Sequence, residues 1–188
     1  EETGLELYYC RNVSLSVLKL TFKAGESGVY QYGTAFYDCR NISVDSSRIH
    51  GFEQSVLLDN SRDVVLEDCE FVNGTFFLTH GDLGGTYEVK NCTVNGKPLF
   101  YRSGVSGGLI EPPDECGQAL LVNISGAQIA GFNVTGAEGL ELRDCSNLSL
   151  GGVRVEPRED CWSDSCFTLA RCDNVTVSDC SASGARSG

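Results

Sequence analysis

The chain has 188 residues and a net charge of −12. This acidity argues against nucleic acid and anionic membranes as partners, since both bind basic surfaces. Hydrophobic residues make up 41% of the chain and charged residues 21%, which excludes a disordered protein and predicts one folded domain over residues 1–188. No apolar run reaches the roughly 18 residues that a membrane span needs.

Ten cysteines indicate an oxidising, extracellular location, and the lack of a Cys-x-x-Cys pair argues against a zinc site. We therefore expect no metal and no cofactor. The chain contains no methionine and opens at Glu1-Glu2-Thr3. We expect a secreted mature form whose signal peptide has been removed, and the alternative is a partial chain.

In chain order, one pattern recurs seven times: apolar-x-apolar-x-x-apolar-x-apolar. The first copy is Val13, Leu15, Leu18 and Leu20. Later copies begin at Ile42, Val64, Tyr87, Ala127, Leu148 and Val175. Alternation with period two predicts strands, and the two-residue step inside each copy predicts a bend.

A second apolar pair, such as Leu5 and Leu7, precedes most copies, so each repeat has at least two short strands. One repeat cannot bury its apolar face alone, but repeats stacked about 4.8 Å apart can. The sequence therefore predicts an all-β fold, a parallel β-helix (β-solenoid) of seven to nine short coils. We expect irregular insertions at about 95–118, which leaves room for one further coil, and at 156–166.

The residue before each copy is commonly Asn or Asp. These side chains tolerate the left-handed αL conformation and bond to nearby backbone, so they suit corners between strands. Stacked corners would align them into a ladder. The predicted corner ladder consists of Asn12, Asn41, Asp63, Asn147 and Asn174.

Three stretches resemble a known family: residues 95–101 (Asn-Gly-Lys-Pro-Leu-Phe-Tyr), 117–123 (Gly-Gln-Ala-Leu-Leu-Val-Asn) and 147–150 (Asn-Leu-Ser-Leu). They are similar to the NosD-like β-helix repeats common in archaeal surface proteins. The close resemblance covers about residues 95–150, and the looser repeat covers nearly the whole chain. It implies a right-handed parallel β-helix and an exported archaeal protein. It implies no reaction, because such repeats serve enzymes, adhesins and scaffolds alike.

The cysteines fall into two columns relative to the repeat. Cys10, Cys39, Cys145 and Cys172 lie three residues before a copy, and Cys69, Cys92 and Cys180 lie five residues after its start. The second column is an inward position, so its cysteines serve as core residues or as disulfide partners. Neighbouring coils could bring Cys10 near Cys39, and Cys145 near Cys172, within disulfide range.

Three disulfide candidates lie outside the columns: Cys116, Cys161 and Cys166. Cys161 and Cys166 bracket part of a long loop, which could close on itself or reach another subunit. We expect at least one cysteine to crosslink subunits.

Asn-x-Ser/Thr occurs eight times, and half of these asparagines are the predicted corner residues. An amide packed in a ladder cannot also carry a sugar. Any N-linked glycans are therefore expected at Asn73, Asn91, Asn123 or Asn133.

No catalytic residues are predicted, and the chain is not expected to be an enzyme. Parallel β-helices include polysaccharide lyases and hydrolases, which need paired carboxylates or an acidic calcium site. The best acidic cluster, Asp59, Asp63, Glu67, Asp68 and Glu70, is typical of a solvated turn and strand face. Neither the lone His80-Gly81-Asp82 nor the glycines near residue 104 match a catalytic or phosphate-binding motif.

Neither end of the chain shows a capping helix, so both edge coils would present open β-edges, which invite pairing between subunits. With the cysteines and the acidity, this resembles by type the tubular sheath proteins of filamentous methanogens, which are insoluble, β-rich and crosslinked by disulfides. The sequence thus predicts a structural, self-assembling cell-envelope subunit, in a sheath or surface layer, whose partner is itself. The alternatives are a polysaccharide-active β-helix enzyme and a carbohydrate-binding adhesin with Tyr30, Tyr32, Phe36 and Tyr37 in register.

Overall fold

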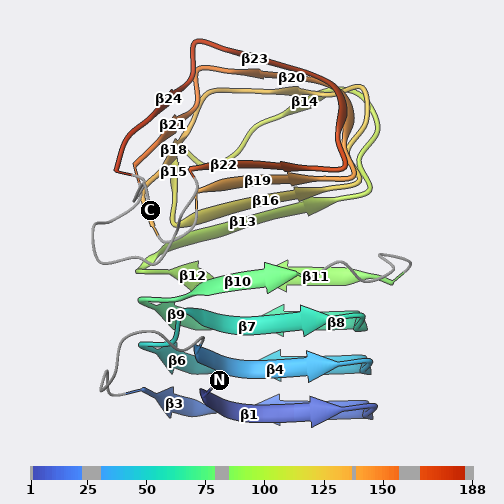
Figure 1. Cartoon of the computed structure of the whole chain (residues 1–188), viewed down its shortest axis with the longest axis vertical. Helices are drawn as coiled ribbons and strands as arrows, with labels where there is room; N and C mark the ends of the chain where they lie inside the picture. The colour runs from blue at the N-terminus through green and yellow to red at the C-terminus, as the bar shows by residue number, and fades with distance from the viewer. Residues whose placement is uncertain (1, 23–30, 79–84, 137–138, 157–165, 185–188) are drawn as a thin grey trace. The chain divides into compact units, whose positions relative to one another are not determined.

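The computed structural model describes residues 2–22, 31–78, 85–136, 139–156 and 166–184. All regular secondary structure within these residues is β-strand. The chain divides into two compact units, unit 1 (Glu1–Gly96) and unit 2 (Lys97–Gly188), which are described separately below (Figure 1).

The described part of unit 1 is a succession of short strands. In chain order they are β1 (Glu2–Tyr8), β2 (Arg11–Ser16), β3 (Lys19–Thr21), β4 (Gln31–Tyr37), β5 (Arg40–Asp45), β6 (Arg48–His50), β7 (Gln54–Asp59), β8 (Arg62–Glu67), β9 (Glu70–Val72), β10 (Thr75–Leu78), β11 (Tyr87–Lys90) and β12 (Thr93–Val94).

Every third strand of unit 1 belongs to the same sheet. The orders are β1-β4-β7-β10, β11-β8-β5-β2 and β12-β9-β6-β3, and all neighbours pair in parallel. The chain thus visits three sheets in turn and returns to the first one position farther along. Three consecutive strands are called a coil below, and equivalent positions in successive coils form a column.

Unit 2 follows the same plan. Its strands are β13 (Lys97–Ser103), β14 (Leu109–Ile110), β15 (Glu115–Cys116), β16 (Gln118–Val122), β17 (Gln128–Ile129), β18 (Asn133–Val134), β19 (Leu140–Arg143), β20 (Ser146–Gly151), β21 (Arg154–Val155), β22 (Phe167–Ala170), β23 (Asp173–Ser178) and β24 (Ser181–Ala182). They form the parallel orders β22-β19-β16-β13, β14-β17-β20-β23 and β15-β18-β21-β24.

The period-two pattern explains why these segments are strands. In β5, Ile42 and Val44 are buried while Ser43 between them is partly exposed. Ile42 lies beside Val13 and Val64 of the neighbouring strands, so inward residues stack into apolar columns. Burial of each column requires the coils above and below it, because one coil provides only a ring of side chains.

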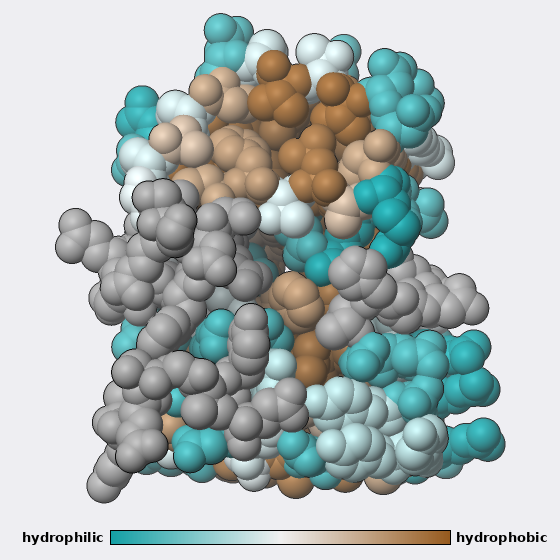
Figure 2. Space-filling model, in the orientation of Figure 1, coloured by the Kyte–Doolittle hydropathy of each residue, from teal (hydrophilic) through white to brown (hydrophobic). Residues whose placement is uncertain are grey.

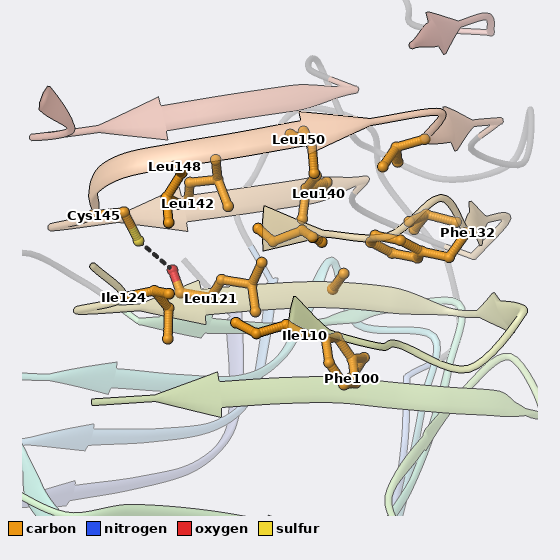
Figure 3. Packing of buried hydrophobic residues seen from close by; sticks show 14 of the residues in the cluster. Phe100, Ile110, Leu121, Ile124, Phe132, Leu140, Leu142, Cys145, Leu148 and Leu150 are labelled. Atoms are coloured by element: carbon orange, nitrogen blue, oxygen red, sulfur yellow. Dashed lines mark hydrogen bonds between the residues drawn. The ribbon is translucent and has the colours of Figure 1, made fainter. Parts of the chain in front are cut away.

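Unit 2 encloses its own apolar core. Leu121, Leu140, Leu142, Leu148 and Leu150 pack together inside the coils (Figure 3). Rings join the cluster from two coils, since Phe100 and Phe132 meet edge to face with centroids 6.3 Å apart.

The all-β class and the parallel strands predicted from the repeat are confirmed. Residues 97–116 lie in the expected irregular insertion, which left room for one further coil, and they contribute β13, β14 and β15, which pair in register with the next coil. This coil lacks the full repeat because Gly108 stands opposite Ala127 and Asp114 stands opposite Phe132. The second expected insertion, 156–166, lies mostly outside the described residues.

Candidate functional site

The corners between strands share one backbone arrangement, an αL residue followed by an inward side chain. Asp38 (φ 53°) precedes Cys39, and Asp144 (φ 51°) precedes Cys145. Asn and Asp adopt αL more readily than other side chains with a Cβ. Within the described residues, Asp-Cys and Asn-Cys dipeptides therefore mark corners, a sequence signal separate from the apolar repeat.

The inward cysteine at a corner acts as a hydrogen-bond donor. Cys39 Sγ donates at 3.3 Å to the carbonyl two residues before it and at 3.3 Å to Leu7 O of the preceding coil. In the next coil, Ser61 Oγ occupies the same column and donates to the equivalent carbonyls, including Phe36 O at 3.0 Å. Thiol and hydroxyl thus make the same bonds here, and they add a side-chain donor to carbonyls that include Tyr37 O, which also accepts from Tyr9 N.

Cysteines in successive coils also meet each other. The register that pairs Arg11 with Arg40 places Cys10 beside Cys39 in the next coil. Cys145 and Cys172 are related in the same way. Cys69 and Cys92 form a third such pair.

Burial and these neighbours change the thiol pKa values. Burial, together with the neighbouring Cys172, raises the pKa of Cys145 to about 11. Burial likewise raises the pKa of Cys39. In the third pair, the hydrogen bond between the thiols lowers the pKa of Cys69 and raises that of Cys92. The thiols of Cys39, Cys92 and Cys145 are therefore protonated and poorly nucleophilic at neutral pH.

The nine cysteines within the described residues are free thiols. Cys116 is buried, which raises its pKa to about 12, and donates to Asn133 O at 3.6 Å. Cys166 donates to a backbone carbonyl at 3.8 Å, and Cys180 accepts from Val153 N at 3.4 Å. Cys161 lies outside the described residues, so disulfide pairing of the candidates stays a prediction.

The corner asparagines lie in amide ladders. Asn41 Nδ2 donates to Asn12 Oδ1 at 2.7 Å in unit 1, and Asn174 Nδ2 donates to Asn147 Oδ1 at 2.7 Å in unit 2. All four residues are αL, with φ between 51° and 56°. In both ladders the later coil donates and the earlier coil accepts.

Two further corner positions fit the same backbone requirement. Asp63 (φ 57°) accepts from the backbone N–H and the hydroxyl of Thr86, each at 3.2 Å. Gly126 (φ 62°) takes the αL position in the column of Asn147, where the absence of a Cβ removes the strain.

The four expected glycan acceptors differ in exposure. Asn91, Asn123 and Asn133 are exposed, whereas Asn73 is half-buried. The Asn73 backbone N–H donates to Asn95 Oδ1 at 2.8 Å. Glycosylation at the three exposed positions stays a prediction.

The residues weighed for the alternative functions occupy structural positions. Asp68 is an αL corner residue, and Glu70 pairs with Arg48 at 3.3 Å. Phe36 lies in the core rather than on a surface row, and Tyr37 stacks on Tyr8 with centroids 4.7 Å apart. In the described ranges, His, Cys, Asp and Glu form no group of three suited to a metal. His80 and Tyr30 are outside those ranges.

The last coil of unit 2 leaves its inward column partly open. Leu142 in β19 is 0% exposed, but Leu169, its partner in β22, is 46% exposed. Leu150 and Val177 repeat this contrast between β20 and β23, at 0% and 47%. The area framed by β22, β23 and β24 in Figure 1 shows apolar side chains at the surface in Figure 2.

The first coil of unit 1 is open in the same way. The inward residues of β1 and β2 are half-buried, whereas those of β4 and β5 are fully buried. Each of β1, β2 and β3 has a strand neighbour on one side in the described part of the chain, as do β22, β23 and β24. Both end coils therefore combine an open strand edge with partly exposed apolar columns, as does the edge strand β11, whose inward Tyr87 and Val89 are half-buried.

No protein-family model matches the chain, and a search of curated proteins found no significant match. Among the described residues, no helix is long and apolar enough to span a membrane.

Proposed function

We propose that this protein is a structural, self-assembling subunit of an extracellular cell envelope, a sheath or surface layer. It polymerises through the open β-edges of its end coils. The observation that carries this proposal is the exposure of Leu169 and Val177 in columns whose preceding members, Leu142 and Leu150, are fully buried.

The energetics favour contact at these ends. Complete burial of a Leu or Val side chain stabilises by about 1.5–3 kcal/mol, so each half-exposed residue still holds roughly 1 kcal/mol. An open strand edge adds backbone donors and acceptors that another strand can satisfy. A stacked coil would satisfy both requirements at once.

The fold within each unit is proposed to be a right-handed parallel β-helix. In support, consecutive strands visit three parallel sheets in a fixed rotation. Crossovers between parallel strands are right-handed in nearly all proteins. This architecture suits the subunit of a cell wall layer, because every coil presents the same parallel strand edges. Each added subunit can then form the same contact as the one before it.

The cysteine pairs would lock the coils of each subunit under oxidising conditions, and a cysteine that reaches another subunit would lock the polymer. Cys10–Cys39, Cys69–Cys92 and Cys145–Cys172 are already neighbours in successive coils. Closing a disulfide transfers two electrons and two protons from two thiols to an oxidant such as dioxygen, which an extracellular location supplies. The resemblance to NosD-like repeats of archaeal surface proteins and to methanogen sheath proteins supports the same location.

Electron microscopy of the native chain, with and without reductant, tests the proposal. Filaments, hoops or sheets that loosen on reduction are expected. Leu169→Asp should abolish them, because the charge enters the exposed column. Leu109→Asp is the matched control, since Leu109 is 59% exposed beside the inward Ile110 and lies outside the end coils.

Discrete particles that do not assemble at any concentration, in either redox state, would overturn the structural function. If Leu169→Asp and Leu109→Asp abolished assembly equally, the exposed column of the last coil would not be the cause of assembly.

A further inference from the structure

We propose that the last coil of one copy (β22–β24) receives the first coil of a second copy (β1–β3) as its next coil, in one fixed register. Residues 169–182 of the first copy lie opposite residues 7–20 of the second. This inference rests on the proposed self-assembly and specifies its partner and its contact.

The register follows from an alignment of the two end coils without a gap. Leu7, Cys10, Asn12, Val13 and Ser16 correspond to Leu169, Cys172, Asn174, Val175 and Ser178. The backbone agrees, because β2 (Arg11–Ser16) and β23 (Asp173–Ser178) both begin one residue after the cysteine and have six residues. Asn12 and Asn174 are both αL, with φ of 56° and 51°. The two ends are therefore successive members of one repeat.

The amide ladder has the correct polarity to continue across this junction. In both units the later coil donates Nδ2 and the earlier coil accepts at Oδ1. Asn174 Nδ2 already donates to Asn147, and Asn12 Oδ1 already accepts from Asn41. Asn12 Nδ2 of the incoming copy would then donate to Asn174 Oδ1.

The cysteine column continues in the same direction. Cys39 Sγ donates to Leu7 O of the coil before it, and Cys172 Sγ donates to Leu142 O of the coil before it. At the junction, Cys10 Sγ would reach Leu169 O. Cys10 and Cys172, both half-exposed, become neighbours in the column.

Charge also favours this junction. Within unit 1, Arg11 lies opposite Arg40, a like-charge pair. In the proposed register Arg11 of the incoming copy lies opposite Asp173, and opposite charges across neighbouring strands stabilise by about 0.2–1 kcal/mol.

A second contact involves the exposed Tyr9, which comes opposite Arg171. The Arg171 guanidinium is held by two bonds to Asp144, at 2.6 and 2.7 Å, so its plane is fixed for stacking on a ring. Joining two identical ends would instead turn the strands antiparallel and break the amide ladder.

A crosslinking experiment reads the register directly. In the full chain, Cys39→Ser and Cys145→Ser leave Cys10 and Cys172 without a thiol in the next coil of their own unit, and Ser61 shows that the column accepts serine. Isotope-labelled and unlabelled protein are mixed and oxidised with diamide, which takes two electrons and two protons from each thiol pair. Mass spectrometry should find Cys10 of one isotope joined to Cys172 of the other.

The matched control moves one thiol out of register. In the same background, Cys172→Ser with Ala170→Cys places the thiol two residues away, opposite Tyr8. Its crosslink yield to Cys10 should fall at least about fivefold. Equal yields, or predominant Cys10–Cys10 linkage, would overturn the register.

Charge exchange provides a second measurement that needs no cysteine chemistry. Arg11→Asp and Asp173→Arg should each reduce polymer mass in sedimentation by up to about fivefold, as expected for a pair contributing up to about 1 kcal/mol. The double variant should restore assembly. Wild-type polymers without rescue in the double variant would overturn this register and leave the structural function standing. A wild-type chain that never assembles would overturn both the register and the structural function.

Discussion

At the residue scale, the corner determines which side chains this fold accepts. An αL residue reverses the chain, and the next side chain enters the interior beside carbonyls of the bend. Cys39 and Ser61 make the same two bonds to these carbonyls, which include Tyr37 O and Asp59 O. Ile124 fills the equivalent position in unit 2 without a donor, so the corner accepts both small donors and apolar side chains.

Substitution of Cys39 tests this role. Cys39→Ser should be close to neutral, because the hydroxyl reproduces the bonds of Ser61. Cys39→Ala removes the donor without adding atoms to the core, and should lower the free energy of unfolding by about 1–2 kcal/mol. Urea denaturation under reductant measures both. Cys10→Ala is the comparison, because the half-exposed Cys10 thiol also donates, to Tyr8 O, where water can replace it. Its loss should be smaller, and an equal loss would contradict the buried-donor explanation.

The raised pKa of Cys145, about 11, predicts alkaline destabilisation. Thiols in the unfolded chain titrate near 8.5, so the folded state holds this proton more tightly. The stability is complete below about pH 8.5 and falls as the pH rises toward 11, at up to about 1.4 kcal/mol per pH unit. Urea unfolding at pH 7 to 10.5 should show a shallower decline for Cys145→Ser. If the free energy of unfolding fell equally steeply with pH in both proteins, the Cys145 thiol would not be a source of the alkaline destabilisation.

At the element scale, β19 buries two charged side chains that its sequence pattern would place in solvent. Leu140 and Leu142 face the core, but Glu141 and Arg143 between and after them are also buried, at 8% and 3% exposure, and form an ion pair. Alternation predicts that both charges face solvent. Burial of the outer face of β19 is a tertiary effect, since neighbouring Leu120 of β16 is also fully buried.

Breaking this pair should be costly. Glu141→Ala leaves a buried guanidinium without its main counter-charge, and should lower the free energy of unfolding by about 3–5 kcal/mol. Glu141→Leu combined with Arg143→Leu should lower the free energy of unfolding less than the single change does, because it leaves no unpaired charge buried. The control is Glu156→Ala, whose exposed pair with Arg154 spans 3.8 Å and should be near neutral. Chemical denaturation of the reduced protein measures all three.

At the scale of the whole molecule, the coils differ mainly in whether they have neighbours on both sides. Inward residues are fully buried in the middle coils of each unit and only partly buried at β1–β3, at β11 and at β22–β24. A solenoid accumulates stability from contacts between adjacent repeats, so its end repeats contribute least until something covers them.

The column that contains Leu142 and Leu169 allows the stability contributed by an inner coil and by an end coil to be compared. Leu142→Ala removes fully buried methyl groups and should cost about 2–4 kcal/mol in the unassembled protein. Leu169→Ala, in the next coil of the same column, should cost well under half of that. In assembled material the two effects should converge, because stacking buries Leu169. Equal costs in the monomer would mean that β22 is not an open end.

The amino-acid sequence by itself determined the all-β class, the parallel stacking and the corner positions. These depend on local periodicity and on αL tolerance, which short stretches carry. The columns Cys10–Cys39 and Cys145–Cys172 were also predictable, because a fixed offset from each repeat becomes a spatial neighbour once coils stack.

Only the tertiary structure decided the rest. It showed that residues 97–116 contribute three strands, although Gly108 and Asp114 stand there in place of two apolar residues of the repeat. It buried Glu141 and Arg143, because burial of an outward face depends on packing outside the strand. It also identified which coils lie open, since exposure in a repeat depends on the presence of a neighbour and not on the residue itself.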